Sequence, residues 1–258
     1  MIANTQRLFS KLLSAMKINV ICDVGSMNGQ DALAFRVAAP SATIFAFEPN
    51  PENLRLMRAD PALREQHIEV VPLAVTHSDG QAEFFVVRAD YSTTNDWRGM
   101  SSLHRRPHQA ELLTAVPVET TRLDTFLADK CSPGTRMGLW VDVEGKAYEA
   151  MEGASGLVKN IQLLHVEVDT SPYISADQKL YPEVHTLLRS MGFAEVATDG
   201  QHTSFQFNAL FVRRDLSRAM QFKVKMCLAE GRLRFVITNT VRRAMRLFRR
   251  AWPEAWIP

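Results

Sequence analysis

A turn rich in glycine and short polar residues directly follows the first apolar run of the sequence, residues 18–22. Its polar and glycine residues are Asp23, Gly25, Ser26, Asn28 and Gly29. A helical pattern and a second apolar run come next, and the second run ends at Glu48. In a parallel α/β sheet, a ligand binds beyond the carboxyl ends of the strands, where a glycine turn admits it to the backbone and a carboxylate accepts two ribose hydroxyls. The order of these residues therefore indicates a site for a nucleoside-containing cofactor.

The glycine spacing distinguishes between classes of nucleoside cofactor. Dinucleotide-binding turns need three glycines, so that a pyrophosphate can lie on a helix N-terminus. This turn has only Gly25 and Gly29, and the negative charge of Asp23 would repel a pyrophosphate but attract the ammonium group of a methionine moiety. We therefore expect S-adenosylmethionine. The alternative, a βαβ unit whose glycines serve only the turn, stays open because a two-glycine pattern is a weak signal.

The composition fits one α/β domain with extensions. The chain has 258 residues, of which 46% are hydrophobic and 22% charged, enough to bury one substantial core. Three cysteines, Cys22, Cys131 and Cys227, lack the spacing of metal ligands, which is typical of a reduced cytoplasmic protein. The sequence shows no signal-peptide pattern and no apolar run near the roughly 20 residues that span a bilayer. We expect a soluble or peripheral protein.

Strand-like and helical periods alternate along the chain, as in a doubly wound sheet. We expect strands near residues 68–75, 82–87, 139–143, 163–168, 193–197 and 205–212, and helices near residues 51–59, 146–151 and 176–191. An amphipathic helix near residues 5–16 is expected to cap the domain. The predicted organisation is a cap helix over residues 1–17, an α/β domain over 18–215 and a helical extension over 216–258.

A long polar stretch, residues 88–109, interrupts this alternation. Loops of such length in compact domains are usually lids or disordered. Because this one carries aromatic, hydroxyl and basic side chains, we expect a lid that faces the substrate. Its candidate substrate-binding residues are Trp97, Ser101, Ser102 and His104, and Tyr91, Met100, Arg105 and Arg106 lie in the same stretch.

Several separated blocks occur in an order that matches one family. They are residues 23–29, 47–51, 74–80, 101–103, 123–124 and 142–145. Together they resemble the FkbM-type, S-adenosylmethionine-dependent class I methyltransferases over residues 18–213. The resemblance implies a Rossmann-like, mostly parallel seven-stranded sheet with an antiparallel last strand and helices on both faces. It also implies O-methylation of a surface glycan, a lipid-linked saccharide or a secondary metabolite.

The resemblance also implies roles for single residues. Asp23, Gly25 and Asn28 would hold the methionine end of the cofactor, Glu48 its ribose, and Ala74 would lie by the adenine. The remaining candidates for the cofactor pocket are Ser26, Gly29, Pro49, Asn50 and Asp142. Two departures from the family pattern stand out: Ser26 to Asn28 replace a common Ala-Asn pair, and Ala147 replaces a common second glutamate.

Methyl transfer from a sulfonium to a hydroxyl requires an aligned acceptor and a base. Asp142, at the end of a predicted strand, is the first candidate for the base or for a metal ligand. Glu144 follows on the same side, although a role as a charge at a helix N-terminus is equally consistent with its position. His104 and Glu167 are the other catalytic candidates.

A divalent cation is an alternative to a lone base. His165, Glu167 and Asp169 alternate onto one side of their strand, and carboxylates from two strands could hold a cation that polarises the hydroxyl. Asp142, Glu167 and Asp169 are the candidate ligands. For His165, a hydrogen-bonded core histidine is the favoured interpretation. Tyr173 lies in a turn that we expect to border the acceptor pocket.

Residues 216–258 carry ten Lys or Arg and two Glu, whereas the other residues carry 20 basic and 26 acidic groups. Such asymmetry suggests an anionic partner for the tail. A helical projection puts five arginines between 242 and 250 opposite apolar residues, so residues 235–258 are predicted to bind an anionic membrane surface at the inner face of the membrane. The alternative is a helix packed on the core or on a second subunit of a homo-oligomer.

Two other functions remain open at this stage. A nucleic-acid methyltransferase would use the basic tail to bind phosphates, but the remaining chain is acidic and shows no aromatic-basic interleaving, so nucleic acid is not the expected partner. The other is a non-catalytic module that binds the cofactor. The leading prediction is an O-methyltransferase that acts on a saccharide or small-molecule acceptor.

Overall fold

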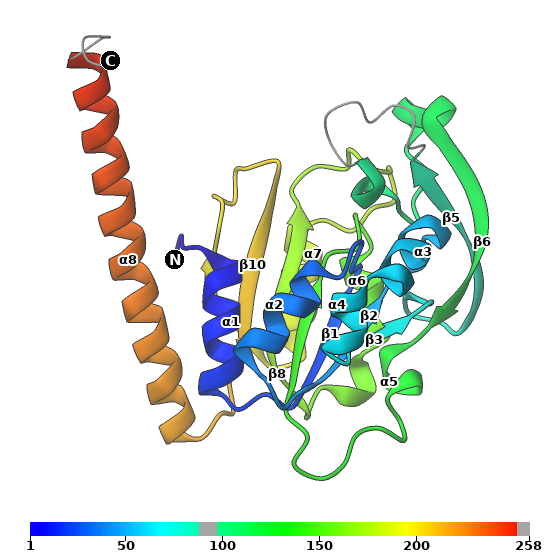
Figure 1. Ribbon diagram of the computed structural model, residues 1–258, viewed down its shortest axis with the longest axis horizontal. Helices are drawn as coiled ribbons and strands as arrows, with labels where there is room; N and C mark the ends of the chain where they lie inside the picture. Colours follow the sequence, from blue (N-terminus) through cyan, green and yellow to red (C-terminus); the bar gives the residue numbers. More distant parts are fainter. Residues whose placement is uncertain (88–96, 252–258) are drawn as a thin grey trace.

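A seven-stranded, mostly parallel sheet forms the centre of the molecule (Figure 1). The structure, a computed structural model, describes residues 1–87 and 97–251. In spatial order the strands are β3 (Glu69–Val71), β2 (Thr43–Phe47), β1 (Val20–Val24), β7 (Met137–Val141), β8 (Ile161–Asp169), β10 (Gln206–Arg213) and β9 (Phe193–Thr198). Neighbouring strands from β3 to β8 are parallel, and β10 is antiparallel to both β8 and β9. The predicted fold class, including the antiparallel last strand, is confirmed.

Alternate residues of the central strands enter two separate hydrophobic cores, one on each face of the sheet. Ile21 and Trp140 belong to one core, and Cys22 and Leu139 to the other. All five residues of β1 are buried, as are all five of β7. Parallel strands covered on both faces need such continuous apolar sequences, because neither face meets water. The same pattern made these strands recognisable in the sequence.

Helices cover both faces of this sheet. Residues of α1 (Thr5–Ala15) and α2 (Gln30–Ala38) pack into the Trp140 core, as do residues of α3 (Pro51–Ala59) and α4 (Pro61–Glu65). Residues of α5 (Leu123–Phe126), α6 (Ala147–Glu152) and α7 (Tyr181–Ser190) pack into the Leu139 core. Asn50 and Asp60 begin α3 and α4 by accepting hydrogen bonds from backbone N–H groups, and a proline follows each cap.

A second, three-stranded sheet was not expected from the sequence. Its order is β4 (Ala74–Val75), β6 (Leu113–Thr121) and β5 (Gly80–Val87). The single strand predicted over residues 68–75 is wrong, because Pro72 separates β3 from β4 and the two belong to different sheets. The prediction missed β6, whose Pro117 discourages a strand assignment. At Pro117, β6 has only one neighbouring strand, β5, because β4 pairs with β6 only at Thr120 and Thr121. A proline is tolerated at such an edge position.

The helix predicted over residues 176–191 begins later than expected, at Tyr181. Pro182 lies in its first turn, where a missing N–H costs nothing. The preceding residues form a turn instead, and in it Gln178 donates a hydrogen bond to the carboxylate of Asp169. The turn therefore adds a contact to the sheet edge at which the candidate site lies.

The helix α8 (Arg218–Ala251) runs along α1 and then extends beyond the α/β domain (Figure 1). Its Val224 is buried, and Glu230 forms an ion pair with Lys11 of α1. A Cβ atom on Gly231 would lie 2.5 Å from a methyl carbon of Leu8, so glycine permits the close approach of the two helices there. Among the described residues, none of the helices combines the length and apolar character needed to cross a membrane.

Candidate functional site

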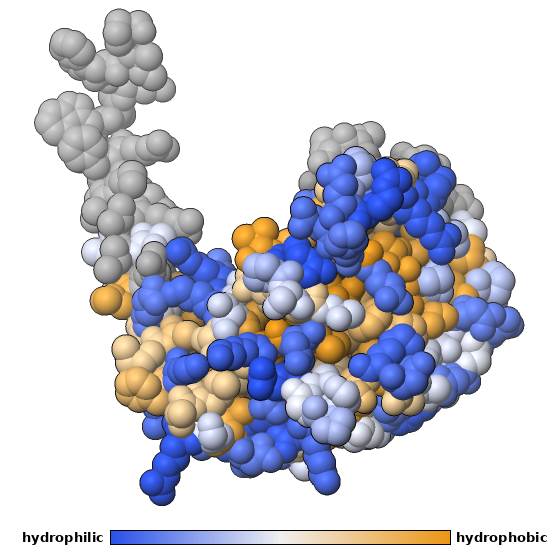
Figure 2. Space-filling view, turned by 60° about the horizontal axis from the view of Figure 1, so that its bottom comes forward, coloured by the Kyte–Doolittle hydropathy of each residue, from blue (hydrophilic) through white to orange (hydrophobic). Residues whose placement is uncertain are grey.

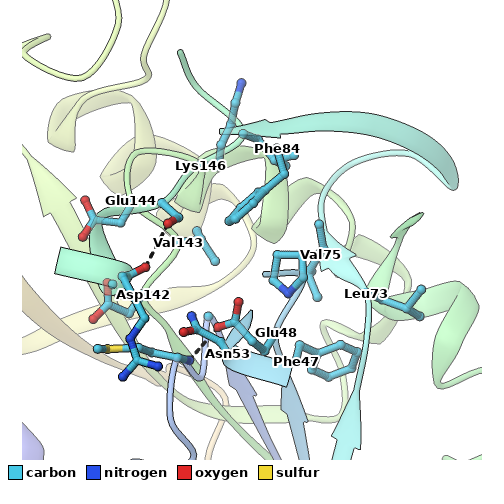
Figure 3. A pocket seen from close by; sticks show the side chains of 18 residues that line it. Phe47, Glu48, Asn53, Leu73, Val75, Phe84, Asp142, Val143, Glu144 and Lys146 are labelled. Carbon is cyan, nitrogen blue, oxygen red and sulfur yellow. Dashed lines mark hydrogen bonds between the residues drawn. The ribbon is translucent and has the colours of Figure 1, made fainter. Parts of the chain in front are cut away.

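A pocket opens at the carboxyl ends of β1, β2 and β7 (Figure 3). Asp142 and Glu144 lie on one side of the pocket, and the apolar Leu73 and Val75 lie on the other. Of the candidate cofactor residues, those that line it are Gly25, Glu48, Pro49, Ala74 and Asp142. The pocket thus has an acidic wall and an apolar wall.

The glycine turn approaches the strand β7 so closely that it excludes side chains. Gly25 has φ +86°, and a Cβ atom there would lie 1.8 Å from the carbonyl oxygen of Asp142. Gly29 has φ +78° and begins α2. Met27 also has a positive φ, 54°, and lines the pocket, although sequence analysis did not select it. The turn thus places backbone, rather than side chains, against any ligand near Gly25.

Asp23 lies beneath this turn rather than on the pocket surface. It is 1% exposed, and Ser26 Oγ donates a 2.5 Å hydrogen bond to its Oδ2. Burial is the main reason that the pKa of Asp23 rises to about 8. Its buried Oδ1 has no hydrogen-bond partner within the described part of the chain. Asp23, Ser26 and Asn28 are not among the pocket-lining residues, and Asp23 supports the turn from beneath through its hydrogen bond with Ser26.

Glu48 accepts backbone hydrogen bonds through both of its carboxylate oxygens, one of them from the glycine turn. Oε2 accepts from the N–H of Met27 at 2.7 Å, and Oε1 accepts from the N–H of Asn50 at 2.7 Å. Burial raises the pKa of Glu48 to about 7, while these hydrogen bonds act in the opposite direction. Each oxygen has a further lone pair, so a ribose hydroxyl could still donate to this pocket-lining carboxylate. Asn50 itself caps α3 by accepting from Glu52 N–H.

Four carboxyl groups gather at the ends of β7 and β8. Asp142, Glu144 and Glu167 each offer an oxygen, and these oxygens lie within 4.8 Å of one another. The fourth, Asp169, is 3% exposed and accepts a hydrogen bond from Gln178. The predicted ligand set of Asp142, Glu167 and Asp169 thus differs by one residue from the observed trio. Glu144 joins it from a turn in which its own φ is 48°, a conformation that strand parity does not anticipate.

The negative charge of this carboxylate cluster is only partly offset. Arg106, 4% exposed, forms a 2.6 Å ion pair with Glu144. Burial and the neighbouring carboxylate Asp142 raise the pKa of Glu144 to about 7, and burial raises the pKa of Asp169 to about 6. Burial also raises the pKa values of Asp142 and Glu167. Such a cluster favours either bound protons or a bound cation.

The described part of the 88–109 stretch is held against the second sheet. Ser102 exchanges backbone hydrogen bonds with Phe85 of β5, and its hydroxyl donates to the carbonyl of Glu144 at 2.7 Å. The hydroxyl of Ser101 donates to the carbonyl of Arg98 at 2.9 Å and accepts from Val87 N–H at 3.1 Å. Ser101 lines the pocket. Tyr91 and the side chain of Trp97 lie outside the described residues.

His104 is buried near Lys146 and Asp177. It is 4% exposed, its Nδ1 lies 3.9 Å from the carboxylate of Asp177, and its buried Nε2 has no partner within the described residues. Burial, with a smaller effect of Lys146, lowers the pKa of His104, so its neutral form is favoured. A neutral imidazole with a free nitrogen could accept a proton. His104 is not itself among the pocket-lining residues.

Tyr173 and Phe205 form an aromatic pair near Glu144 and Asp169 of the carboxylate cluster. Their ring centroids are 4.1 Å apart, and Phe205 is 54% exposed. The guanidinium of Arg106 lies over Tyr173, 5.7 Å from its centroid. Arg106 thus connects this aromatic pair to Glu144. Phe205 was not selected from the sequence, because an aromatic residue at the start of a strand resembles a core position.

His165 does not contribute to the candidate site. Its ring stacks on Trp140, its Nε2 lies 2.9 Å from Thr5 Oγ1, and burial lowers its pKa to about 3. The interpretation as a hydrogen-bonded core histidine is confirmed. Sequence analysis missed the pocket residues Asn53, Phe84, Arg98 and Lys146. Asn53 had a detectable signal, because it follows Asn50 by one helical turn on the helix after Glu48.

Comparison with known proteins identifies the family of this chain. The sequence model of the family described as Methyltransferase FkbM domain matches residues 23–194. The 2-O-methyltransferase NoeI of Sinorhizobium fredii is 27% identical over 171 residues, which cover 63% of this chain and 65% of NoeI. The bifunctional kinase-methyltransferase WbdD is matched over 81% of this chain and 39% of WbdD, with 13% identity and a TM-score of 0.47. Human N-acetylserotonin methyltransferase, solved with SAM, is matched over 81% of this chain and 51% of its own, with 14% identity and a TM-score of 0.39.

Proposed function

Because the chain belongs to the FkbM methyltransferase family, we propose that it transfers a methyl group from S-adenosylmethionine to a hydroxyl oxygen of a saccharide or small-molecule acceptor. The observation that carries this proposal is the position of Asp142, which lines the pocket and whose carboxyl group belongs to the carboxylate cluster. One group thus joins the expected cofactor site to a set of potential proton acceptors.

The cofactor fits the two walls of the pocket. The apolar wall, with Leu73, Val75 and Phe84, suits an adenine ring, and Glu48 lies between the glycine turn and that wall. Gly25 and Met27 of the glycine turn line the pocket at the end where the methionine moiety is expected. When bound, S-adenosylmethionine supplies an electrophilic methyl group on a sulfonium.

The protein's own contribution is to align the acceptor and receive its proton. In an in-line displacement, the acceptor oxygen forms a bond to the methyl carbon as the sulfur–carbon bond breaks, and the hydroxyl proton must leave. Asp142 is the proposed proton acceptor, since a carboxylate of raised pKa is a stronger base than an ordinary one. Glu167 and Glu144 lie within reach to share that proton.

A divalent cation would fit the same carboxylates. Asp142, Glu144 and Glu167 converge with three oxygens, and Arg106 offsets only part of their charge. Hard divalent cations prefer carboxylate oxygens. We propose these three residues as its ligands, in which case the cation would polarise the acceptor hydroxyl. Asp169 is the weaker candidate because Gln178 already occupies one of its oxygens.

The acceptor class is proposed from the name of one relative and from the aromatic pair. NoeI is a 2-O-methyltransferase, and this chain spans 65% of its length. The exposed ring of Phe205 beside Tyr173 offers an apolar face, of the kind on which a sugar ring can pack, next to the acidic wall. The name of the relative supports an oxygen-directed reaction, and the aromatic pair supports a saccharide as the acceptor.

The test is a methyl-transfer assay with isotopically labelled S-adenosylmethionine and a panel of saccharides, phenols and RNA. We expect labelled methyl ethers on saccharides, identified by mass spectrometry. A label found only on nitrogen, or only in RNA, would contradict the O-directed assignment. Measurable cofactor binding without transfer to any acceptor class would instead support the non-catalytic module.

A further inference from the structure

The first part of α8, residues 218–233, has two apolar faces. The inner face contacts α1 and the sheet core through Val224, Cys227, Leu228 and Gly231. The second face is exposed, and its large residues Phe222, Met226 and Leu233 are 65%, 56% and 61% exposed. Figure 2 shows apolar residues over this part of α8 at the left of the molecule. We call Phe222, Met226, Ala229 and Leu233 the outer stripe.

The two faces lie on opposite sides of the helix. Nine residues separate Phe222 from Gly231 and Val224 from Leu233, and nine steps of an α-helix amount to about two and a half turns. The successive steps within the outer stripe are four, three and four residues, the spacing that keeps side chains in one row. Packing on α1 therefore cannot account for the outer stripe.

Basic side chains border the outer stripe. Arg218, Lys225 and Arg232 follow one another at intervals of seven residues along one border, and all three are exposed. Lys223 is exposed on the other border. Glu230 is the sole acidic residue of the sequence between 216 and 240, and it forms an ion pair with Lys11 of α1. The surface around the stripe is therefore cationic.

This charge pattern argues against a second copy of the chain as the partner. In an antiparallel pair of α8 helices, the border with Arg218, Lys225 and Arg232 would meet the same border of the other copy. Like charges beside an apolar seam disfavour pairing. An anionic surface, in contrast, would satisfy the basic borders and accept the apolar stripe at once.

We propose that the outer stripe docks on an anionic phospholipid membrane. α8 then lies in the membrane interface on one face and holds the catalytic domain, through α1, on the other. The sequence supplies five more arginines between residues 242 and 250, which extends the basic character toward the end of the chain.

The experiment is co-sedimentation of the full-length protein with vesicles of phosphatidylcholine alone or mixed with phosphatidylglycerol. We expect binding to the mixed vesicles only, and weaker binding as salt is added. Replacing Phe222, Met226 and Leu233 together by serine should weaken binding about tenfold or more, because the stripe no longer inserts. Replacing Lys223, Lys225 and Arg232 together by glutamine should weaken it to a similar extent.

The matched control is Val37→Ser, because Val37 is 82% exposed on α2, away from the stripe. It should bind the mixed vesicles as the unaltered protein does. Unchanged thermal unfolding and light-scattering mass in all variants would show that each folds normally. Unaltered vesicle binding by the serine variant would overturn the proposal, as would an oligomer of the unaltered chain that dissociates in that variant.

Discussion

The indole ring of Trp140 stacks on the imidazole of His165, with centroids 3.5 Å apart and an interplanar angle of 2°. These residues are direct partners in the pairing of β7 with β8. Two residues further along each strand, Asp142 and Glu167 lie next to each other and share the carboxylate cluster. A stacked pair in the core thus fixes the register that brings the two carboxyl groups together.

The first prediction concerns Asp142. Replacing it by asparagine removes a proton acceptor but preserves size, so turnover should fall by about 100-fold to 10,000-fold. Affinity for the demethylated cofactor, measured by calorimetry, should stay within a few-fold of the unaltered value. If the variant turns over at a nearly normal rate, the base lies elsewhere, with Glu144, His104 and Glu167 as the next candidates.

The second prediction concerns Glu48. The Glu48→Gln variant keeps one acceptor oxygen but loses the charge that binds the ribose hydroxyls, so cofactor affinity should fall by about 1–3 kcal/mol. Calorimetry with S-adenosylmethionine and with NADH measures this. Glu52→Gln, on the adjacent helix and exposed, is the control and should bind normally. Tight binding of NADH with no response to S-adenosylmethionine would overturn the cofactor assignment.

The sequence predicted what depends on local patterns and missed what depends on distant contacts. The continuous apolar runs of β1 and β7 and the glycine turn were recognisable, because burial on two faces and a positive φ each demand particular residue types. β6 was missed, since Pro117 and exposed polar residues hide a strand that pairs mainly with β5. No local pattern could show that Arg106 is buried against Glu144, because 38 residues separate the two in sequence.

The candidate metal ligands illustrate the same limit. Strand parity predicts which side chains share a face of β8, and it correctly placed Glu167 and Asp169 together at its end. Whether Glu144 joins them depends on its left-handed backbone and on Gly145, which has φ 89°. The hydrogen bond between Gln178 and Asp169 depends on a turn that begins after the strand. Both features arise from tertiary structure.

The third prediction concerns Gly25. Alanine there would meet the carbonyl of Asp142 and require an unfavourable φ of +86°, so Gly25→Ala should destabilise the protein by about 3 kcal/mol or more. Gly134→Ala is the matched control, because Gly134 has φ +93° but nothing within 4 Å of the added Cβ. The Gly134→Ala substitution should lower the free energy of unfolding by only about 1–2 kcal/mol. Urea unfolding measures both, and equal losses would show that close approach to Asp142 does not constrain the turn.

The fourth prediction concerns the pH dependence of stability through Asp23. Its pKa is raised from 3.8 to about 8 in the folded protein, so the folded state holds a proton that the unfolded state releases. The contribution of Asp23 to the free energy of unfolding is fully present below pH 3.8, and it is lost as the pH rises toward about 8. Asp23→Asn should therefore gain thermal stability over the unaltered protein as pH increases across this window. Calorimetric Tm values at several pH values measure it, and parallel curves would contradict the buried, protonated carboxyl.

The last prediction concerns the divalent cation. If Asp142, Glu144 and Glu167 are its ligands, Mn²⁺ alone should bind the protein and raise its Tm, because a ligand that prefers the folded state stabilises it. Glu167→Gln should abolish this shift, since an amide has no charge to offer the cation. Asp129→Asn, at an exposed carboxylate outside the cluster, should retain it. Asp169→Asn separates the two possible ligand sets, because it should leave the shift intact if Glu144 completes the site and remove it if Asp169 does. The absence of any Mn²⁺ effect on the unaltered protein would leave the carboxylates to act as proton acceptors, with Asp142 as the base.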